Sequence, residues 1–270
     1  MREAQLRFAR SATADLAVFD DLRTLNVKQV YKGGKLVAEN GKMLHQKEKN
    51  TDWSTEIKER VFHSFHRVPI TVEELQLKET TGTHQRVIDM VAHELITKER
   101  IEEWKELPGV APGVDISRDI VKLAAIERHK NTGHVGLGFL GKYGLKKGAV
   151  ATSIGHDSHN LVIAGVTDED MVLAGNRVIE NGGGLAIALE GKVLADLPLP
   201  IGGLMADEPV EVVDEKLEHM KKLSVELGIS EDIDAFMTLA FISLPVIPKL
   251  RLNTYGVVDV EKHQVVEARF

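Results

Sequence analysis

Residues 149–197 read AVATSIGHDSHNLVIAGVTDEDMVLAGNRVIENGGGLAIALEGKVLADL, and this stretch decides the fold class. Two short apolar runs, 149–154 and 161–166, have the length and composition of strands. The residues between them, 155–160, are GHDSHN, a dense group of polar and turn-forming side chains. The stretch therefore begins with two predicted strands separated by a polar segment.

The clearest helix of the sequence follows these strands. Thr167 can N-cap it, and the acidic residues 168–170 suit the positive end of the helix dipole. An apolar stripe continues to Ile179, and Gly182 stands at the position that ends helices. Residues 184–189 and 192–197 then predict a hairpin across a Glu-Gly turn.

The first part of the chain has a different pattern. Residues 14–19, 27–31 and 35–39 predict a small β-meander, with the Gly33-Gly34 turn between the last two strands. Residues 45–60 are polar and charged, and we interpret them as a linker or an exposed crossover. We therefore divide the chain near residue 60. Residues 1–60 form a partial small β-domain and linker, and residues 61–270 form a second domain.

The second domain mixes strands and helices. Residues 86–90 favour a strand, while 119–129 have helical spacing but a composition that keeps a strand possible. The glycine-rich stretch 131–148 indicates tight turns and close backbone approach. Further helices are expected at 210–227 and 234–242 and further strands at 257–260 and 265–268. The predicted fold class is α/β of the α+β type, with a mostly antiparallel sheet.

Composition excludes several classes of protein. Hydrophobic residues make up 43% of the chain and charged residues 28%, which is typical of a globular protein and not of a disordered one. The net charge of −7 gives no reason to bind nucleic acid or an anionic membrane. The chain has no cysteine and no apolar run of roughly 18 residues, so neither disulfides nor a membrane-spanning helix is expected. We expect a cytoplasmic protein.

Residues 155–160 are the best candidate for a functional site. His156 and His159 can act as general acids or bases or as nitrogen ligands, and Asp157 can orient one of the two imidazoles. Ser158 and Asn160 are the candidate substrate-binding residues. The same residue types also favour a hydrogen-bonded turn without chemistry, and this alternative stays open.

Other candidates are weaker. His63 and His66 would share a helix face but have no third ligand nearby. The glycine-rich stretch does not match a dinucleotide fingerprint or a P-loop. The Gly202-Gly203 pair follows two prolines and predicts a tight turn, with a flexible flap as the alternative.

Several stretches, in this order, resemble the adenine deaminases of the amidohydrolase superfamily. The pair ADLAVF (14–19) and VYKGGKLV (30–37) is widely shared in that superfamily's small β-domain. More specific are the later stretches, which are GFL (138–140), GAVA (148–151), IGHDSHN (154–160) and LPLPIGGLM (197–205).

The resemblance implies hydrolysis of adenine to hypoxanthine and ammonia. In the family, a (β/α)₈ barrel with a two-metal centre of Mn or Fe activates the attacking water. A barrel needs roughly 250 residues and a His-x-His pair, and neither fits before residue 14. The resemblance therefore implies a C-terminal portion that lacks the metal-binding barrel. We expect no metal ligands and no cofactor in this chain itself.

Three hypotheses follow. In the first, the chain belongs to an adenine deaminase, with the segment from His156 to Asn160 supporting the active site, and is inactive alone. In the second, it is a non-catalytic oligomerisation or purine-binding module. In the third, it is an independent metal-dependent hydrolase that uses His156, Asp157 and His159. The expected partners are adenine, the missing barrel domain and a second copy of the chain in a homo-oligomer, a dimer.

Overall fold

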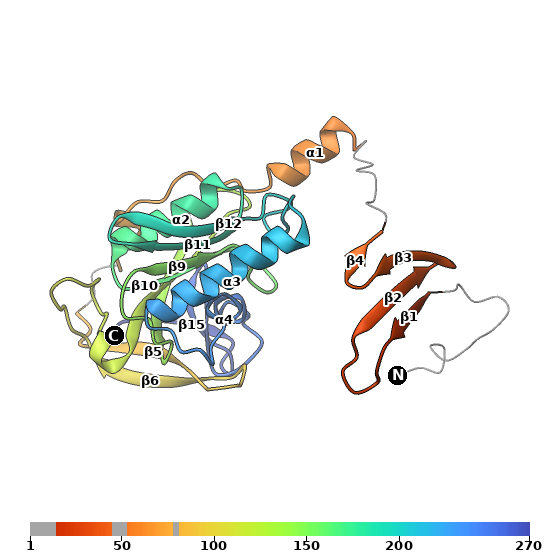
Figure 1. The fold of residues 1–270 in the computed structure, drawn as a ribbon. Helices are drawn as coiled ribbons and strands as arrows, with labels where there is room; N and C mark the ends of the chain where they lie inside the picture. The colour runs from red at the N-terminus through yellow and green to blue at the C-terminus, as the bar shows by residue number, and fades with distance from the viewer. Residues whose placement is uncertain (1–14, 45–52, 78–80) are drawn as a thin grey trace. The chain divides into compact units, whose positions relative to one another are not determined.

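The computed structural model describes residues 15–44, 53–77 and 81–270 (Figure 1). The chain divides after Trp53 into two compact units. The first unit ends at Trp53, and the second spans residues 54–270.

The first unit is a four-stranded antiparallel sheet in the order β1-β2-β3-β4. The Gly33-Gly34 turn, with both φ angles positive, joins β2 to β3 as predicted. The first predicted strand begins at Leu16, and Ala14 lies outside the described residues. The strands are β1 (Leu16–Phe19), β2 (Val27–Lys32), β3 (Lys35–Glu39) and β4 (Lys42–Met43).

The predicted linker contains a helix. Residues 45–52 of it lie outside the described part, but α1 covers Thr55–Phe62. The Ser54 side chain caps this helix by accepting the backbone N–H of Ile57 at 3.3 Å. None of the residues of α1 is buried. The polar composition therefore reflects exposure, and the sequence pattern did not predict the helix in this segment.

An eight-stranded sheet forms the centre of the second unit, in the order β12-β11-β9-β10-β7-β8-β5-β6. Every neighbouring pair is antiparallel except β5 with β8, which confirms the predicted mixed and mostly antiparallel sheet. The strands are β5 (His84–Met90), β6 (Thr97–Glu103), β7 (Ile120–Ile126), β8 (Val135–Gly141), β9 (Ala149–Thr152), β10 (Leu161–Gly165), β11 (Gly184–Leu189) and β12 (Lys192–Pro198).

Both faces of the sheet are covered by other elements. Helix α2 (Asp168–Glu180) contacts β9, β10, β11 and β12 on one side (Figure 1). Ala124 and Ile126 of β7 belong to the apolar core beneath α2. Leu123 and Ala125 belong to the opposite core, which also contains residues of α3 (Val210–Glu226) and α4 (Ala235–Ile242). Because both faces of β7 are buried, its sequence is almost continuously apolar, and this explains why its periodicity left helix and strand open.

A second, smaller sheet packs on the α3–α4 side. It consists of β13 (Leu250–Asn253), β14 (Gly256–Asp259) and β15 (Gln264–Val266). The glycine-rich segment of β8 permits this packing, since a Cβ built on Gly136 would lie 1.9 Å from the carbonyl oxygen of Asn253. The predicted close backbone approach is thus confirmed, and it occurs within a strand.

The predicted helices are also confirmed. The Thr167 hydroxyl accepts the backbone N–H of Asp170 at 3.3 Å, and Gly182 has a φ of +67° just after α2. Across residues 15–44, 53–77 and 81–270, no helix combines the length and the apolar character that a membrane crossing needs.

Candidate functional site

The GHDSHN segment forms the connection between β9 and β10. Within it, the backbone N–H of His159 donates to the carbonyl of Gly155. The backbone N–H of His156 donates to the carbonyl of Ala240 in α4 at 2.9 Å. The Ser243 hydroxyl, just after α4, donates to the carbonyl of His156 at 3.4 Å. The turn is therefore closed on itself and attached to the end of α4.

The buried side chain of Arg128 fixes this turn by hydrogen bonds to backbone carbonyls. Its side chain is buried, and its Nε donates to the carbonyl of His159. Its Nη2 donates to the carbonyl of Gly202 at 3.1 Å, and its Nη1 lies 3.5 Å from that of Ser64. The backbone N–H of Arg128 also donates to Oδ1 of Asn160 at 3.4 Å. One guanidinium thus joins three chain segments that are distant in sequence.

A buried serine reinforces the same junction. The Ser153 hydroxyl, at the end of β9, donates to the carbonyl of Gly203 at 2.6 Å. It accepts the backbone N–H of Gly184 at 2.7 Å. The Gly202-Gly203 pair forms the predicted tight turn, with both φ angles positive. Arg128 and Ser153 therefore hold the turn of residues 201–205 beside the His156–Asn160 turn.

Three imidazoles gather around the turn. The ring of His156 lies 4.5 Å from the ring of Phe241 between their centroids, and 6.2 Å from the ring of His159. The Nε2 of His129 lies 2.7 Å from the carbonyl oxygen of Ser158, to which it can donate. The predicted pair of histidines is thus brought together, and His129 joins it.

The surroundings of His159 favour its neutral form. Burial lowers the pKa of His159 below its usual value, and the positive charge of Arg128 lowers it further, followed by His156 and His129. The backbone N–H of Gly155 donates to its Nδ1 at 3.4 Å, so the ring proton of the neutral form is on Nε2. Burial also lowers the pKa of Arg128, to about 10, which leaves its charge intact at neutral pH. His159 therefore offers an N–H donor rather than a cation.

The other predicted residues are exposed or half-buried. Asp157 and Ser158 are exposed, and His156 is half-buried. Among the hydrogen bonds and ion pairs of the described ranges, none involves the side chain of His156, Asp157 or Ser158. Asn160 is half-buried and uses its carbonyl oxygen for Arg128. The turn therefore combines a fixed backbone with free polar side chains.

The described residues do not assemble a metal site. In this part of the chain, no three His, Cys, Asp or Glu side chains are arranged to hold a metal ion. His63 and His66 do not share a helix face, because α1 ends at Phe62 and His63 is its C-cap. His63 instead pairs with Glu59 at 3.4 Å.

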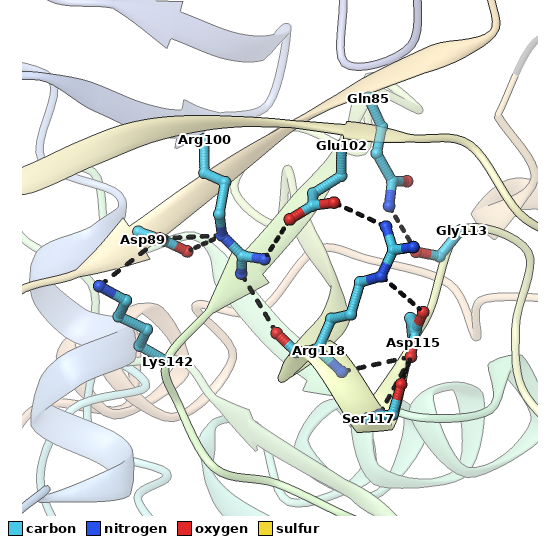
Figure 2. A network of polar contacts seen from close by, with 9 residues as sticks. All are labelled: Gln85, Asp89, Arg100, Glu102, Gly113, Asp115, Ser117, Arg118 and Lys142. Atoms are coloured by element: carbon cyan, nitrogen blue, oxygen red, sulfur yellow. Dashed lines mark hydrogen bonds and ion pairs between the residues drawn. The ribbon is translucent and has the colours of Figure 1, made fainter.

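A second polar cluster lies at the β5–β6 edge (Figure 2). Arg100 donates from Nε to Asp89 at 2.9 Å and from Nη1 to Glu102 at 2.8 Å. Arg118 pairs with the same Glu102 at 2.6 Å and with Asp115 at 3.4 Å. The cluster alternates carboxylates with cations, and each charge drawn in Figure 2 has a partner. We interpret it as a structural network, since its charged side chains pair with one another.

Sequence reasoning missed Arg128 and His129. Both lie just after β7 and well before the GHDSHN segment in the chain, so no local pattern links them to it. A single Arg after an apolar strand has no distinctive spacing. Its role arises because β7 pairs with β10 in the sheet, which places Glu127 to His129 beside residues 158–160.

The chain is similar to known adenine deaminases. Residues 94–264 match the family described as the adenine deaminase C-terminal domain. The relatives include "Adenine deaminase 2" of Carboxydothermus hydrogenoformans, which is 43% identical over 254 residues, or 94% of this chain and 43% of that protein. The adenine deaminase of Lysinibacillus sphaericus is 39% identical over 94% of this chain and 43% of its own length.

The match is partial in the same way for a third relative. The adenine deaminase of Petrotoga mobilis is 41% identical over 93% of this chain and 42% of its own length. The chain thus spans less than half the length of these relatives. The free polar turn and the segments that hold it lie within the matched region, and the chain belongs to the adenine deaminase C-terminal domain family.

Proposed function

We propose that this chain acts as the C-terminal region of an adenine deaminase, which converts adenine and water to hypoxanthine and ammonia. The relatives that carry this name support the assignment. In the proposal, the chain supports the active site or the assembly and is inactive alone. In the proposal, the water-activating Mn or Fe is held by a barrel domain and not by this chain. In the described ranges, no three His, Cys, Asp or Glu side chains are arranged to hold a metal ion.

One structural observation supports the turn from His156 to Asn160 as the functional site. The turn from His156 to Asn160 has a backbone fixed by Arg128, Ala240 and Ser243, while its foremost side chains are unpaired within the described ranges. Unpaired side chains on a rigid support are suited to contact a ligand or a neighbouring domain, because little conformational entropy is lost on binding.

Within this turn we assign roles to five residues. His156, Asp157 and His159 support catalysis. The lowered pKa of His159 favours its neutral imidazole, which can donate or accept a hydrogen bond. Ser158 and Asn160 contact the substrate. The amide nitrogen of Asn160 is the group available for this, because its oxygen already accepts from Arg128.

The first experiment measures ammonia release from adenine with Mn²⁺ or Fe²⁺. The purified chain is expected to show no turnover. The chain combined with the remaining N-terminal part of the Carboxydothermus relative is expected to be active. Activity of the chain alone, abolished by His156→Ala, would contradict the proposal and support an independent hydrolase.

The second experiment tests the turn within the combined enzyme. His156→Ala and His159→Ala are expected to lower kcat by at least tenfold, on the order of the contribution of a positioned polar group. The matched control is His219→Ala, since His219 is an exposed histidine of α3 far in sequence from the turn. Unchanged kcat and KM in both turn variants would restrict the chain to assembly or purine binding without chemistry.

A further inference from the structure

A cavity of about 170 Å³ lies between α4 and the connection from β5 to β6. It is separate from the His156–Asn160 turn. Its wall is largely apolar, and its lining includes Met90, Glu94, Ile96, Met237, Phe241 and Arg251. Leu95, Ile96 and Met237 keep 51%, 39% and 46% of their surface exposed, so the cavity has an apolar entrance.

Arg251 places a buried charge in this wall. Its side chain is 1% exposed. Its Nε donates to the carbonyl of Ile247 at 2.8 Å, and its Nη2 donates to the carbonyls of Leu95 and Pro248. The donors on Nη1 have no hydrogen-bond acceptor in the part of the chain that the structure describes.

This guanidinium also lacks a counter-ion. No carboxylate of the described residues forms an ion pair with Arg251, and Glu94 in the cavity wall is exposed and unpaired. Burial lowers the pKa of Arg251 to about 10, so the side chain keeps its positive charge at neutral pH. A buried, permanently charged guanidinium is normally compensated by an anion, because an unpaired charge is costly in an apolar environment.

We propose that this cavity binds a small monocarboxylate with a short apolar chain, whose carboxylate pairs with the guanidinium of Arg251. The carboxylate supplies the missing counter-charge in a geometry that matches guanidinium donors. The apolar chain lies against Met90, Ile96 and Phe241, and the volume accommodates only a few carbon atoms. A phosphate dianion fits less well, because one guanidinium cannot balance its charge.

One residue, Phe241, connects the cavity to the proposed functional turn. Phe241 lines the cavity, and the ring of Phe241 contacts the ring of His156 at 4.5 Å between centroids. A ligand in the cavity would therefore contact the ring of Phe241, and that ring in turn contacts His156. Binding itself is independent of the proposed deaminase function, so it can be measured without enzyme activity.

The test uses two methionines as reporters. In the full chain labelled with ¹³C at the methionine methyl groups, butyrate is added and the Met90 and Met237 signals are followed by NMR. Saturable shifts with a Kd on the order of 1 mM are expected for a ligand of this size. Met171 and Met220, buried in the two cores and absent from this cavity, should not shift.

The probe control is butyramide, which has the same shape and no charge. It is expected to shift the reporters at least tenfold more weakly. Equal responses to both compounds, or no saturable response to butyrate up to about fifty times that Kd, would overturn the proposal.

The variant control blocks the entrance without touching Arg251. Met237→Trp is expected to abolish the butyrate response of Met90, and Met205→Trp, at another exposed methionine, should leave it unchanged. Glu94→Gln should tighten binding, since it removes a negative charge from the wall that repels the carboxylate of butyrate. Arg251→Gln should abolish binding if its remaining methionine signals show a folded chain. An unchanged response in Met237→Trp, or in folded Arg251→Gln, would refute the site.

Discussion

The Nε of Arg128 donates a hydrogen bond to the backbone carbonyl of His159, and Nη2 of the same guanidinium donates to the carbonyl of Gly202. The two specific stretches that resemble adenine deaminases, IGHDSHN and LPLPIGGLM, are therefore joined through a residue that belongs to neither. This relationship makes Arg128 a positioning residue for the turn. It also predicts how substitutions at Arg128 and His159 should change the stability of the protein.

Replacing Arg128 should destabilise the protein strongly. Arg128→Met leaves the carbonyls of His159 and Gly202 without their donor in a buried place, so unfolding free energy should fall by about 3 kcal/mol. Arg128→Lys keeps the charge but not the fork of donors, and its loss should be smaller. Urea denaturation measures both. The control is Arg60→Met, an exposed arginine of α1, for which a change within about 0.5 kcal/mol is expected.

The titration of His159 should appear in the pH dependence of stability. Its pKa is lowered in the folded state, so the unfolded state binds the proton more readily. Neutral His159 therefore contributes to folding stability above the ordinary histidine pKa of about 6.5. This contribution is lost as the pH falls through the lower pKa that His159 has in the folded state. His159→Asn removes the titration and tolerates the φ of +48° at this position.

Urea denaturation between pH 7 and pH 5 measures this effect. The free energy of unfolding of His159→Asn should fall less steeply with acidification than that of the unmodified protein. The exposed His219→Asn is the matched control and should follow the unmodified protein. Parallel curves for His159→Asn and the unmodified protein would show that His159 has an unshifted pKa.

The buried ion pair under α2 should show strong coupling. Lys122 Nζ lies 2.7 Å from Asp168 Oδ1, with the two side chains 1% and 5% exposed. Burial lowers the pKa of Lys122, and Asp168 opposes this shift. Asp168→Asn leaves an ammonium without its counter-ion and should cost about 4 kcal/mol.

A double-mutant cycle checks this coupling. Lys122→Met combined with Asp168→Asn should be more stable than Asp168→Asn alone, since no buried charge remains. Additive losses from the two single changes, measured by urea denaturation, would show that the pair is not coupled.

The contact between β8 and the small C-terminal sheet should not tolerate a side chain at Gly136. A Cβ there would lie 1.9 Å from the carbonyl oxygen of Asn253 and 2.7 Å from the nitrogen of Gly256, both backbone atoms. Gly136→Ala should therefore lower the unfolding free energy by about 3 kcal/mol. Gly191→Ala has open space and a φ of +74°, so it should cost only about 1 kcal/mol. Equal losses in thermal unfolding would contradict the close approach.

The local structure of the second unit could be predicted where short-range signals agree. The cap at Thr167, the acidic first turn of α2 and the Gly182 stop are readable because each acts within a few residues. The prediction failed in two kinds of place. Polar residues 55–62 form a helix that buries no residue, and the glycine-rich residues 135–141 form a strand. The helix is capped locally by Ser54, whereas the strand is determined by its pairing with β5 and β7.

The sequence by itself determined the α+β class, the helices and hairpin after residue 167, and the dense polar segment from His156 to Asn160. These features follow from periodicity, capping and composition, which are local properties of the chain. Only the tertiary structure decided that Arg128 lies behind that segment, that the turn at Gly202 meets it, and that Arg251 borders a cavity without a counter-ion. The pairing of distant strands creates these contacts, and their energy depends on burial, which appears only once the sheet has formed.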